Sequence, residues 1–299
     1  MDNINDLQYS KKIVKTSNTV EYNDNISIDD VTVIVPTLDE EEAISLVLDD
    51  IITHGYENIL VVDGNSQDKT LEIVKQKKIP YVTQEGKGKT GAITSALKHI
   101  KTPYIALIDG DCTYAAKDIQ NMFPYINEYD QVIGARSKGR KNISQLNRFG
   151  NWLINTYFNV LFDTKLSDIC SGMYLLKTKY AKKIQLQTEG FDVEVEIAAN
   201  SAKDKSLTEV PIDFFSRVGN QKLNPWKDGL KILTTITKLA FKHKTIRLLS
   251  FFAALLLFPG ILTLFLFPSA RIGMILIVLS LQGLSLLYVD SKFLKKGSL

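Results

Sequence analysis

Short apolar runs and longer amphipathic stretches alternate along the chain from residue 31 to residue 213. The apolar runs, such as 31–35 and 59–62, are rich in valine and isoleucine, as buried strands are. The stretches between them repeat apolar residues at helical spacing, for example over 44–51. The remaining expected strands are 104–108, 131–135, 172–176 and 207–213, and the remaining expected helices contain 71–74, 93–100, 119–126 and 152–162. This alternation indicates βαβ units, so we expect an α/β fold with a mostly parallel sheet covered on both faces.

The C-terminal part has a different pattern, with two long apolar stretches at 248–267 and 272–289. Each is long enough to cross the hydrocarbon core of a bilayer as a helix, and neither contains a charged residue. Only Pro268-Ser-Ala-Arg271 separates them, which predicts a helical hairpin. Basic residues precede the first stretch and follow the second, so the positive-inside rule places both ends in the cytoplasm. A buried hairpin in a soluble core is the alternative, and two consecutive uncharged spans disfavour it.

These patterns divide the chain into five parts. The first is polar and has no apolar core segment, so we expect a flexible leader and not a signal peptide. The membrane-adjacent part mixes apolar residues with lysines, as helices in the headgroup layer do, although an ordinary surface helix is the alternative. In order, the parts are the leader 1–30, the α/β domain 31–223, an amphipathic helix in 224–246, two spans in 247–290 and a basic cytoplasmic tail 291–299.

Composition narrows the classes of partner. The net charge of +3 is too small to imply a nucleic-acid partner. Cys112 and Cys170 are the only cysteines, which suits a reducing compartment and offers no metal-binding spacing. The three histidines stand in unrelated contexts, so a histidine base or metal cluster is not expected. We expect a protein of the cell membrane with its α/β domain in the cytoplasm, and the sequence leaves a homo-oligomer open.

The expected strand at 104–108 ends in Asp109-Gly110-Asp111, which is the most informative motif of the chain. Side chains two residues apart on an extended backbone point to the same side, so Asp109 and Asp111 can share one cation. Carboxylate oxygens suit Mg²⁺ or Mn²⁺, and a diphosphate is the usual third partner of such an ion. A solvated turn is the alternative, because aspartate and glycine also form turns.

Polar segments follow three other expected strands as well, at 36–40, 63–68 and 136–140. In open α/β sheets, ligands bind beyond the carboxyl ends of the strands. Because four separate loops place polar residues at this rim, we expect a binding site there.

The motifs together resemble a known family. In order they are Val-Ile-Val-Pro-Thr followed by acids, Val-Val-Asp-Gly-Asn-Ser, Gly-Lys-Gly-Lys-Thr-Gly, Asp-Gly-Asp, Asp-Ile-Cys-Ser-Gly and Arg-Val-Gly-Asn-Gln-Lys-Leu. This order resembles family 2 glycosyltransferases, and more closely the dolichyl- or polyprenyl-phosphate sugar synthases, over residues 31–223. The resemblance implies a GT-A fold, which is Rossmann-like, a nucleotide-diphosphate sugar donor, and inversion at the anomeric carbon. The C-terminal hairpin is similar to that of membrane-anchored members.

The resemblance also implies roles for residues on the donor side. Four residues would line the nucleoside pocket, a fifth would lie near the base, and Asp109 and Asp111 would hold the metal. Family members often have glutamine two residues beyond the second acid, where this chain has Thr113, so a third protein ligand is not implied. The four nucleoside-pocket residues are Pro36, Thr37, Asp39 and Glu41, and the residue near the base is Asp63.

Cationic residues are needed because two phosphate-bearing substrates must meet in one site. Arg217 and Lys222 match positions that the family uses toward the donor diphosphate or the acceptor phosphate. Lys87 and Lys89 stand in a glycine loop whose freed backbone amides favour anions. Three further arginines are expected to receive the acceptor phosphate, with a solvated surface charge as the alternative for each. They are Arg136, Arg140 and Arg148.

Acidic residues are the remaining catalytic candidates beside Arg217. Asp168 occupies a motif associated with the acceptor side and is expected to orient or deprotonate the nucleophile. Asp192, Glu194 and Glu196 alternate, which aligns them if the segment is extended and spreads them if it is helical. The family pattern favours Glu196, and a solvated edge is the alternative.

The sequence therefore predicts an inverting glycosyltransferase that uses Mg²⁺ or Mn²⁺. It would move a sugar from a UDP- or GDP-linked donor to dolichyl or polyprenyl phosphate at the cytoplasmic membrane face. One alternative is a transferase that extends a lipid-linked glycan through a hydroxyl acceptor, which would need a true general base. Another is a noncatalytic membrane scaffold of the same fold.

Overall fold

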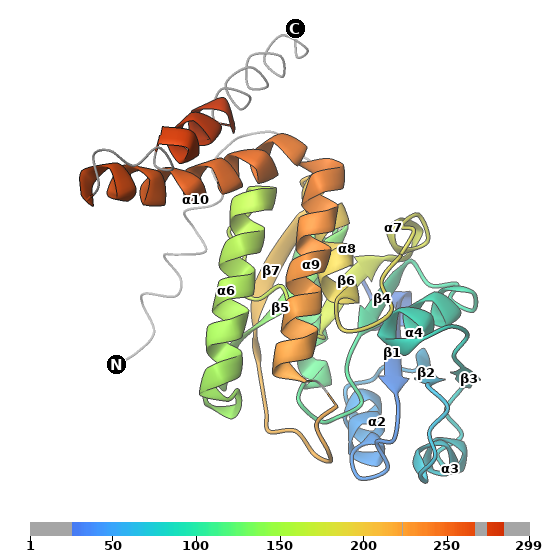
Figure 1. The fold of residues 1–299 in the computed structure, drawn as a ribbon. Coiled ribbons are helices and arrows are strands. Elements are labelled where there is room, and N and C mark those ends of the chain that lie inside the picture. Colours follow the sequence, from blue (N-terminus) through green and yellow to red (C-terminus); the bar gives the residue numbers. More distant parts are fainter. Residues whose placement is uncertain (1–25, 223, 267–273, 284–299) are drawn as a thin grey trace, which may run out of the picture.

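The computed structural model describes residues 26–222, 224–266 and 274–283. An α/β domain surrounds one seven-stranded sheet, and helix α10 (Thr245–Leu266) leaves this domain (Figure 1). The predicted leader therefore lies mostly outside the described residues. The strands are β1 (Val31–Thr37), β2 (Ile59–Asp63), β3 (Tyr81–Thr83), β4 (Tyr104–Leu107), β5 (Gln131–Lys138), β6 (Tyr174–Lys177) and β7 (Leu207–Asp213).

The strand order is β3-β2-β1-β4-β6-β5-β7. Strand β1 is parallel to both β2 and β4, and β5 is parallel to β7. Strand β6 is antiparallel to both of its neighbours, β4 and β5. The sheet is thus mostly parallel, as the sequence predicts, and one reversed strand brings its amino-terminal end to the rim where the parallel strands end.

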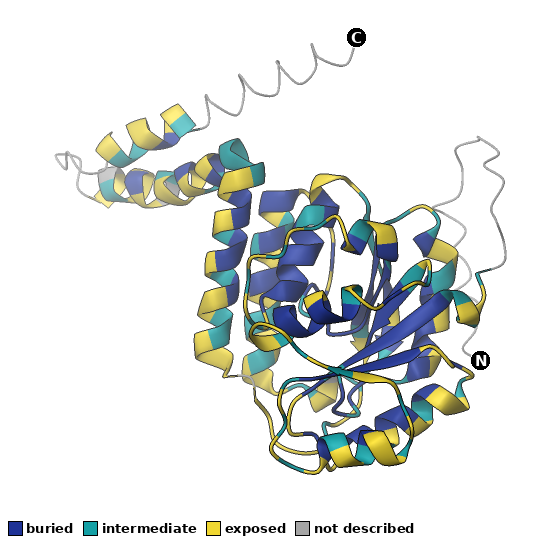
Figure 2. Cartoon of the chain, turned by 90° about the vertical axis from the view of Figure 1, so that its right-hand side faces the viewer, coloured by how far each residue is buried: buried dark blue, intermediate teal, exposed yellow. Residues whose placement is uncertain are grey.

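Helices cover both faces of the sheet, so each central strand is buried on both sides. Alternate residues of β1 enter different cores: Ile34 packs with α4 and α6, whereas Val33 and Val35 pack with α2. The burial view shows the strands as a continuous dark layer (Figure 2). The α-helices of the domain are α2 (Ile44–Thr53), α3 (Thr70–Gln76), α4 (Gly88–Leu97), α5 (Phe123–Ile126), α6 (Gln145–Phe162), α7 (Thr178–Ala181), α8 (Val193–Lys203) and α9 (Pro225–His243), and the 3-10 turns are η1 (Ile28–Asp30), η2 (Ala116–Met122) and η3 (Arg140–Asn142).

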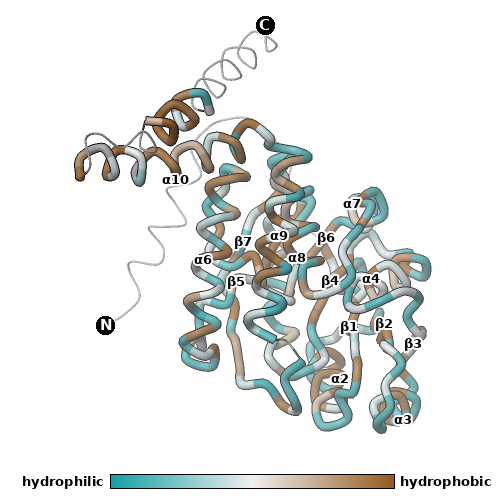
Figure 3. Tube along the Cα trace, viewed as in Figure 1, coloured by the Kyte–Doolittle hydropathy of each residue, from teal (hydrophilic) through white to brown (hydrophobic). Residues whose placement is uncertain are grey.

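Helices α6 and α9 pack side by side, and α10 crosses their upper ends (Figure 1). Within α10, the segment Thr245–Thr263 is long and apolar enough to cross a membrane, with mean hydropathy 2.0. The hydropathy view shows α10 as a largely hydrophobic rod (Figure 3). A second apolar helix, Met274–Gly283, is shorter, and the rest of the predicted hairpin, 267–273 and 284–290, lies outside the described residues. The structure thus supplies one candidate span, and the second span remains a prediction.

Candidate active site

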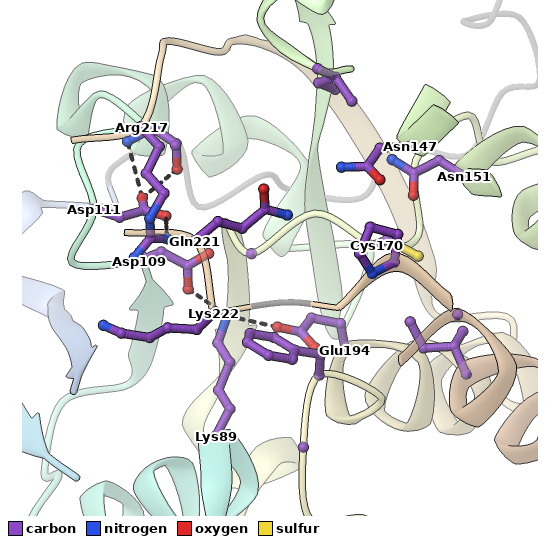
Figure 4. Close-up of a pocket in the computed structure, with 18 of the residues that line it drawn as sticks. Lys89, Asp109, Asp111, Asn147, Asn151, Cys170, Glu194, Arg217, Gln221 and Lys222 are labelled. Atoms are coloured by element: carbon purple, nitrogen blue, oxygen red, sulfur yellow. Dashed lines mark hydrogen bonds and ion pairs between the residues drawn. The ribbon is translucent and has the colours of Figure 1, made fainter. Parts of the chain in front are cut away.

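A cavity of 830 Å³ opens at the rim where β1, β2, β4 and β5 end and β6 begins. One end of this cavity is polar and lies over the Asp109-Gly110-Asp111 motif, as Figure 4 shows. The other end is apolar and lies between α6 and α9. The sequence prediction of a site at this rim therefore agrees with the position of the cavity.

Asp111 is buried at the polar end of the cavity. Its Oδ1 accepts hydrogen bonds from the backbone N–H of Thr113 at 3.1 Å and from the Thr113 hydroxyl at 2.5 Å. Its Oδ2 pairs with the guanidinium of Arg217 at 2.5 Å. Thr113, where family members often have glutamine, thus orients Asp111.

Asp109 pairs with Lys89, whose ammonium lies 2.5 Å from Asp109 Oδ1 and 2.6 Å from Glu194 Oε1 (Figure 4). The side chain of Lys89 is almost fully buried, as is that of Glu194. Gly172, two residues before β6, leaves room for the Asp109 carboxylate, because a Cβ there would lie 2.0 Å from Asp109 Oδ2. A residue without a side chain is therefore required at position 172 for this packing.

Glu40, just beyond β1, forms ion pairs with two cationic side chains of the loop after β7. Its Oε1 lies 2.5 Å from the Arg217 guanidinium and 2.7 Å from the Lys222 ammonium. Lys222 also donates to the backbone carbonyls of Leu38 and Asp39. Sequence reasoning missed Glu40 although it stands between two chosen residues, since a run of acids does not show which member points inward.

The acids of this cluster are costly to ionise. Burial raises the pKa of Asp111, and the charge of Asp109 raises it further, against hydrogen bonds from Thr113 and the charge of Arg217. Burial likewise raises the pKa of Glu40, although Lys222 and Arg217 oppose this shift. Such carboxylates favour any added cation, which is the electrostatic condition for metal binding.

Arg136, at the end of β5, is held by Asp168. Its Nε and Nη2 lie 2.6 and 2.7 Å from the two carboxylate oxygens, and its backbone N–H also donates to Asp168 Oδ2 at 3.1 Å. The guanidinium stacks over the ring of Phe214 at 5.2 Å. Burial lowers the pKa of Arg136, but the charge of Asp168 outweighs this and keeps it well above its usual value. Asp168 therefore orients Arg136, and its carboxylate is not free to face a nucleophile.

The predicted nucleoside residues divide into two groups. Pro36 and Thr37 line the cavity. Asp39, Glu41 and Asp63 lie outside it and accept backbone hydrogen bonds from the loop after β2, at 2.7 Å for Asp39, 3.0 Å for Glu41, and 3.0 and 3.2 Å for Asp63. These three acids brace the loops that form the wall of the cavity.

Several predicted cations lie away from the cavity. Lys87 is exposed at the N-terminus of α4, and its neighbour Lys89 takes the buried position. Arg148 is exposed on α6 and does not line the cavity. Arg140 begins η3, and its side chain lies outside the described part of the structure.

The alternating acids lie on helix α8, so they are spread around it. Glu194 lines the cavity, whereas Glu196 accepts hydrogen bonds from the backbone N–H groups of Gln187 and Thr188 at 2.9–3.0 Å. The segment is thus helical, which is one of the two alternatives that the sequence left open. Glu194 lies at the cavity, whereas the resemblance favours Glu196 there. Recognising this segment as a helix in the sequence would have shown that Glu194 and Glu196 point in different directions.

The residues present fit a divalent cation with two protein ligands. Asp109 and Asp111 come from one loop, both line the cavity, and Gly172 leaves room for the Asp109 carboxylate to sit there. Within the described residues no group of three or more His, Cys, Asp or Glu side chains is arranged to hold a metal. The remaining ligands would therefore come from substrate and water.

Comparisons with known proteins agree with this site. A family model described as glycosyl transferase family 2 matches residues 32–185. The chain is 35% identical over 208 residues to glycosyltransferase AglJ of Haloferax volcanii, covering 67% of this chain and 69% of that protein. It is 31% identical over 223 residues to a dolichyl-phosphate hexose transferase of the same organism, covering 73% of this chain and 97% of the relative.

Solved structures agree at the level of the fold. Glucosyl-3-phosphoglycerate synthase from Mycobacterium tuberculosis, in complex with Mn²⁺, UDP-glucose and phosphoglyceric acid, matches with a TM-score of 0.58 and 15% identity. The match covers 74% of this chain and 86% of that one. The same enzyme in complex with UDP matches with a TM-score of 0.60 over 70% of this chain and 79% of that one. The expected GT-A-like fold is thus confirmed, and the chain belongs to glycosyl transferase family 2 and is a glycosyltransferase.

Proposed function

We propose that this glycosyltransferase moves a sugar from a nucleotide-diphosphate sugar to dolichyl or polyprenyl phosphate at the cytoplasmic face of the cell membrane. One observation carries the proposal. A single cavity has paired acids and cations at one end and an apolar groove at the other. Such a cavity suits two phosphate-bearing substrates of which one has a long hydrocarbon chain.

The polar end fits the donor. A divalent ion held by Asp109 and Asp111 would stabilise the negative charge that develops on the departing nucleoside diphosphate. Arg217 pairs with Asp111 and Glu40, and Lys222 pairs with Glu40, so both cations are placed to pair with phosphate oxygens. Pro36 and Thr37 at the end of β1 would contact the nucleoside.

Arg136 fits the acceptor phosphate, because it lines the cavity and Asp168 fixes its orientation. A phosphate monoester has its second pKa near 6, so it is largely dianionic at neutral pH and needs little activation. An acceptor hydroxyl would need a general base, and Asp168 is occupied by Arg136. This pairing favours the phosphate acceptor over the hydroxyl alternative.

The apolar end fits the hydrocarbon chain of the acceptor. Helices α6 and α9 supply its walls, and α10, the candidate span, begins directly after α9. A polyprenyl chain in this groove would exchange water for aliphatic and aromatic contacts. The apolar lining residues are Ile143, Leu146, Phe149, Leu153, Ile154, Trp226, Leu230, Ile232 and Leu233.

Relatives support the same substrates. One is named as a dolichyl-phosphate hexose transferase, and another, from Methanococcus voltae, as a UDP-N-acetylglucosamine–dolichyl-phosphate N-acetylglucosaminyltransferase, 26% identical over 208 residues, 60% of this chain and 83% of that relative. The structural neighbour with UDP-glucose was solved with Mn²⁺. These names support a hexose-type sugar and a divalent metal.

The reaction follows from these positions. An oxygen of the acceptor phosphate would attack the anomeric carbon of the sugar while the bond from that carbon to the diphosphate oxygen breaks. The electron pair of this bond would leave with the nucleoside diphosphate. Attack opposite the leaving group inverts the anomeric centre, and Arg136 and Arg217 would hold the two phosphates apart in an in-line arrangement.

The direct test is transfer of label from radioactive nucleotide sugars to polyprenyl phosphate in the presence of Mn²⁺ or Mg²⁺. We expect labelled product in the organic phase with the wild type and none with Asp111→Asn. Asp49→Asn, which removes an exposed acid paired with Lys77, is the matched control and should retain transfer. Transfer that needs no lipid phosphate, or that survives in Asp111→Asn, would overturn the proposal.

A further inference from the structure

Helix α6 is apolar on its exposed side, which at Phe149 also borders the cavity. Phe149, Trp152 and Val160 have exposed fractions of 62%, 59% and 49%. The opposite side of the same helix is also apolar and is packed into the core through Phe158 and Leu161. A helix with apolar residues on both sides indicates a second apolar environment in addition to the core of its own domain.

Helix α6 is fixed against the start of the candidate membrane span. The ring of Tyr157 on α6 meets the ring of Phe251 on α10 at 5.2 Å, edge to face. At the end of α6, the Asp163 carboxylate pairs with Arg247 of α10 at 2.8 Å. The side of the domain that carries α6 is therefore held beside the point where α10 departs (Figure 1).

The neighbouring helix α9 carries the charges that suit a lipid surface. Its exposed positions combine Trp226 and Phe241, at 76% and 63%, with lysines. Lys227, Lys238 and Lys242 are all exposed on this helix. Aromatic rings beside lysines are typical of helices in the headgroup layer, where ammonium groups meet lipid phosphates.

We infer that the outer face of α6, formed by Phe149, Trp152, Thr156 and Val160, lies in the interfacial layer of an anionic bilayer. The inference rests on the proposed function only in placing α10 in the membrane. With α6 against the bilayer, the groove between α6 and α9 opens at the lipid surface. A lipid phosphate then reaches Arg136 without its hydrocarbon chain crossing water.

The chain offers a direct probe, because Trp152 and Trp226 are its only tryptophans. In Trp226→Phe, Trp152 is the sole tryptophan of the full-length protein. We would reconstitute this variant into phosphatidylcholine and phosphatidylglycerol vesicles whose acyl chains carry bromine near the headgroup. The inference predicts strong loss of Trp152 fluorescence in brominated vesicles, a blue-shifted emission, and protection from aqueous acrylamide.

A matched control places tryptophan on the far side of the domain. Leu46 of α2 is 57% exposed, so Leu46→Trp in a chain that also carries Trp152→Phe and Trp226→Phe reports from that face. It should be quenched by acrylamide and not by brominated lipid. Trp152 quenched by acrylamide alone would overturn the inference, and so would Trp152 shielded from both quenchers, which would indicate a contact with another protein chain.

Failure of this inference is separable from failure of the proposed function. Wild-type protein in vesicles of the same composition is assayed for transfer of labelled sugar to polyprenyl phosphate. Transfer together with an unquenched Trp152 contradicts only the placement of α6. Quenching without transfer in wild-type vesicles supports the placement of α6 and contradicts the proposed acceptor.

Discussion

Gly172→Ala should displace the Asp109 carboxylate and so weaken metal binding. The new Cβ would lie 2.0 Å from Asp109 Oδ2, whereas ordinary contacts begin at 3.4 Å, so the carboxylate must move by about 1.4 Å. This movement would disturb the 2.5 Å pair between Asp109 Oδ1 and the nearly buried Lys89. Gly172 does not adopt a left-handed backbone conformation, so alanine brings no backbone strain of its own.

Gly172→Ala is expected to affect both the stability of the protein and the rate of sugar transfer. Overpacking a well-packed site costs about 1–3 kcal/mol, which is a fall in melting temperature of roughly 2–4 °C per kcal/mol for a domain of this size. A misplacement of about 1 Å at a reacting centre costs on the order of 100-fold in rate. We therefore expect Gly172→Ala to reduce kcat/KM for sugar transfer by about that factor and to raise the Mn²⁺ concentration needed for half-maximal activity.

A double-mutant cycle identifies the cause, measured as melting temperatures of the detergent-solubilised protein. In an Asp109→Ala chain the carboxylate is absent, so Gly172→Ala should be neutral or stabilising by about 0.4–1 kcal/mol, because alanine restricts the unfolded chain. An equal loss of stability in both backgrounds would refute the assignment of the conflict to Asp109. Unchanged kcat/KM in the single variant would refute the role of that carboxylate.

Three further predictions concern the same cluster. Burial raises the pKa of Asp111, so the wild type loses stability as pH rises from below the ordinary value of 3.8 through the raised value. Metal-free Asp111→Asn should therefore melt higher than the metal-free wild type at neutral pH, and the difference should vanish in acid. An equal difference in melting temperature at all pH values would contradict this. Glu40→Gln should raise KM for the nucleotide sugar by about 10-fold, the equivalent of about 1.4 kcal/mol, because Arg217 and Lys222 lose the acid that holds them together. Unchanged KM would contradict the role of Glu40. Asp168→Asn should lower kcat/KM for the lipid phosphate by about 10–100-fold and leave nucleotide affinity unchanged, because one charge-assisted pair to Arg136 is weakened. Complete loss of transfer to a hydroxyl acceptor would instead support Asp168 as a catalytic base.

The main strands and the acidic motif were predictable because their signal is local. An apolar run followed by Asp-Gly-Asp specifies both a buried strand and the acids at its end, and β4 confirms this. The direction of β6 was not predictable, since a four-residue apolar strand reads alike in either direction. Helix α8 was left open, because its first turn carries Glu194 and Glu196, whose burial depends on partners elsewhere in the fold.

The rest of the site could not be predicted, because it depends on pairings between residues that are far apart in the sequence. Arg136 and Asp168 are 32 positions apart, and Glu40 and Arg217 are 177 apart. Nothing near Asp168 in the sequence shows that its carboxylate is occupied by an arginine. A motif therefore located the rim of the sheet correctly, whereas the division between cavity-lining residues and bracing residues required the three-dimensional structure.

Calorimetric titration of UDP and GDP into the protein, with and without Mn²⁺, tests the central claim most directly. If Asp109 and Asp111 hold the cation that binds the donor diphosphate, one of these nucleotides should bind only with Mn²⁺, and Asp111→Asn should abolish the metal-dependent part. Equal nucleotide affinity without Mn²⁺, or wild-type affinity in Asp111→Asn, would contradict the account.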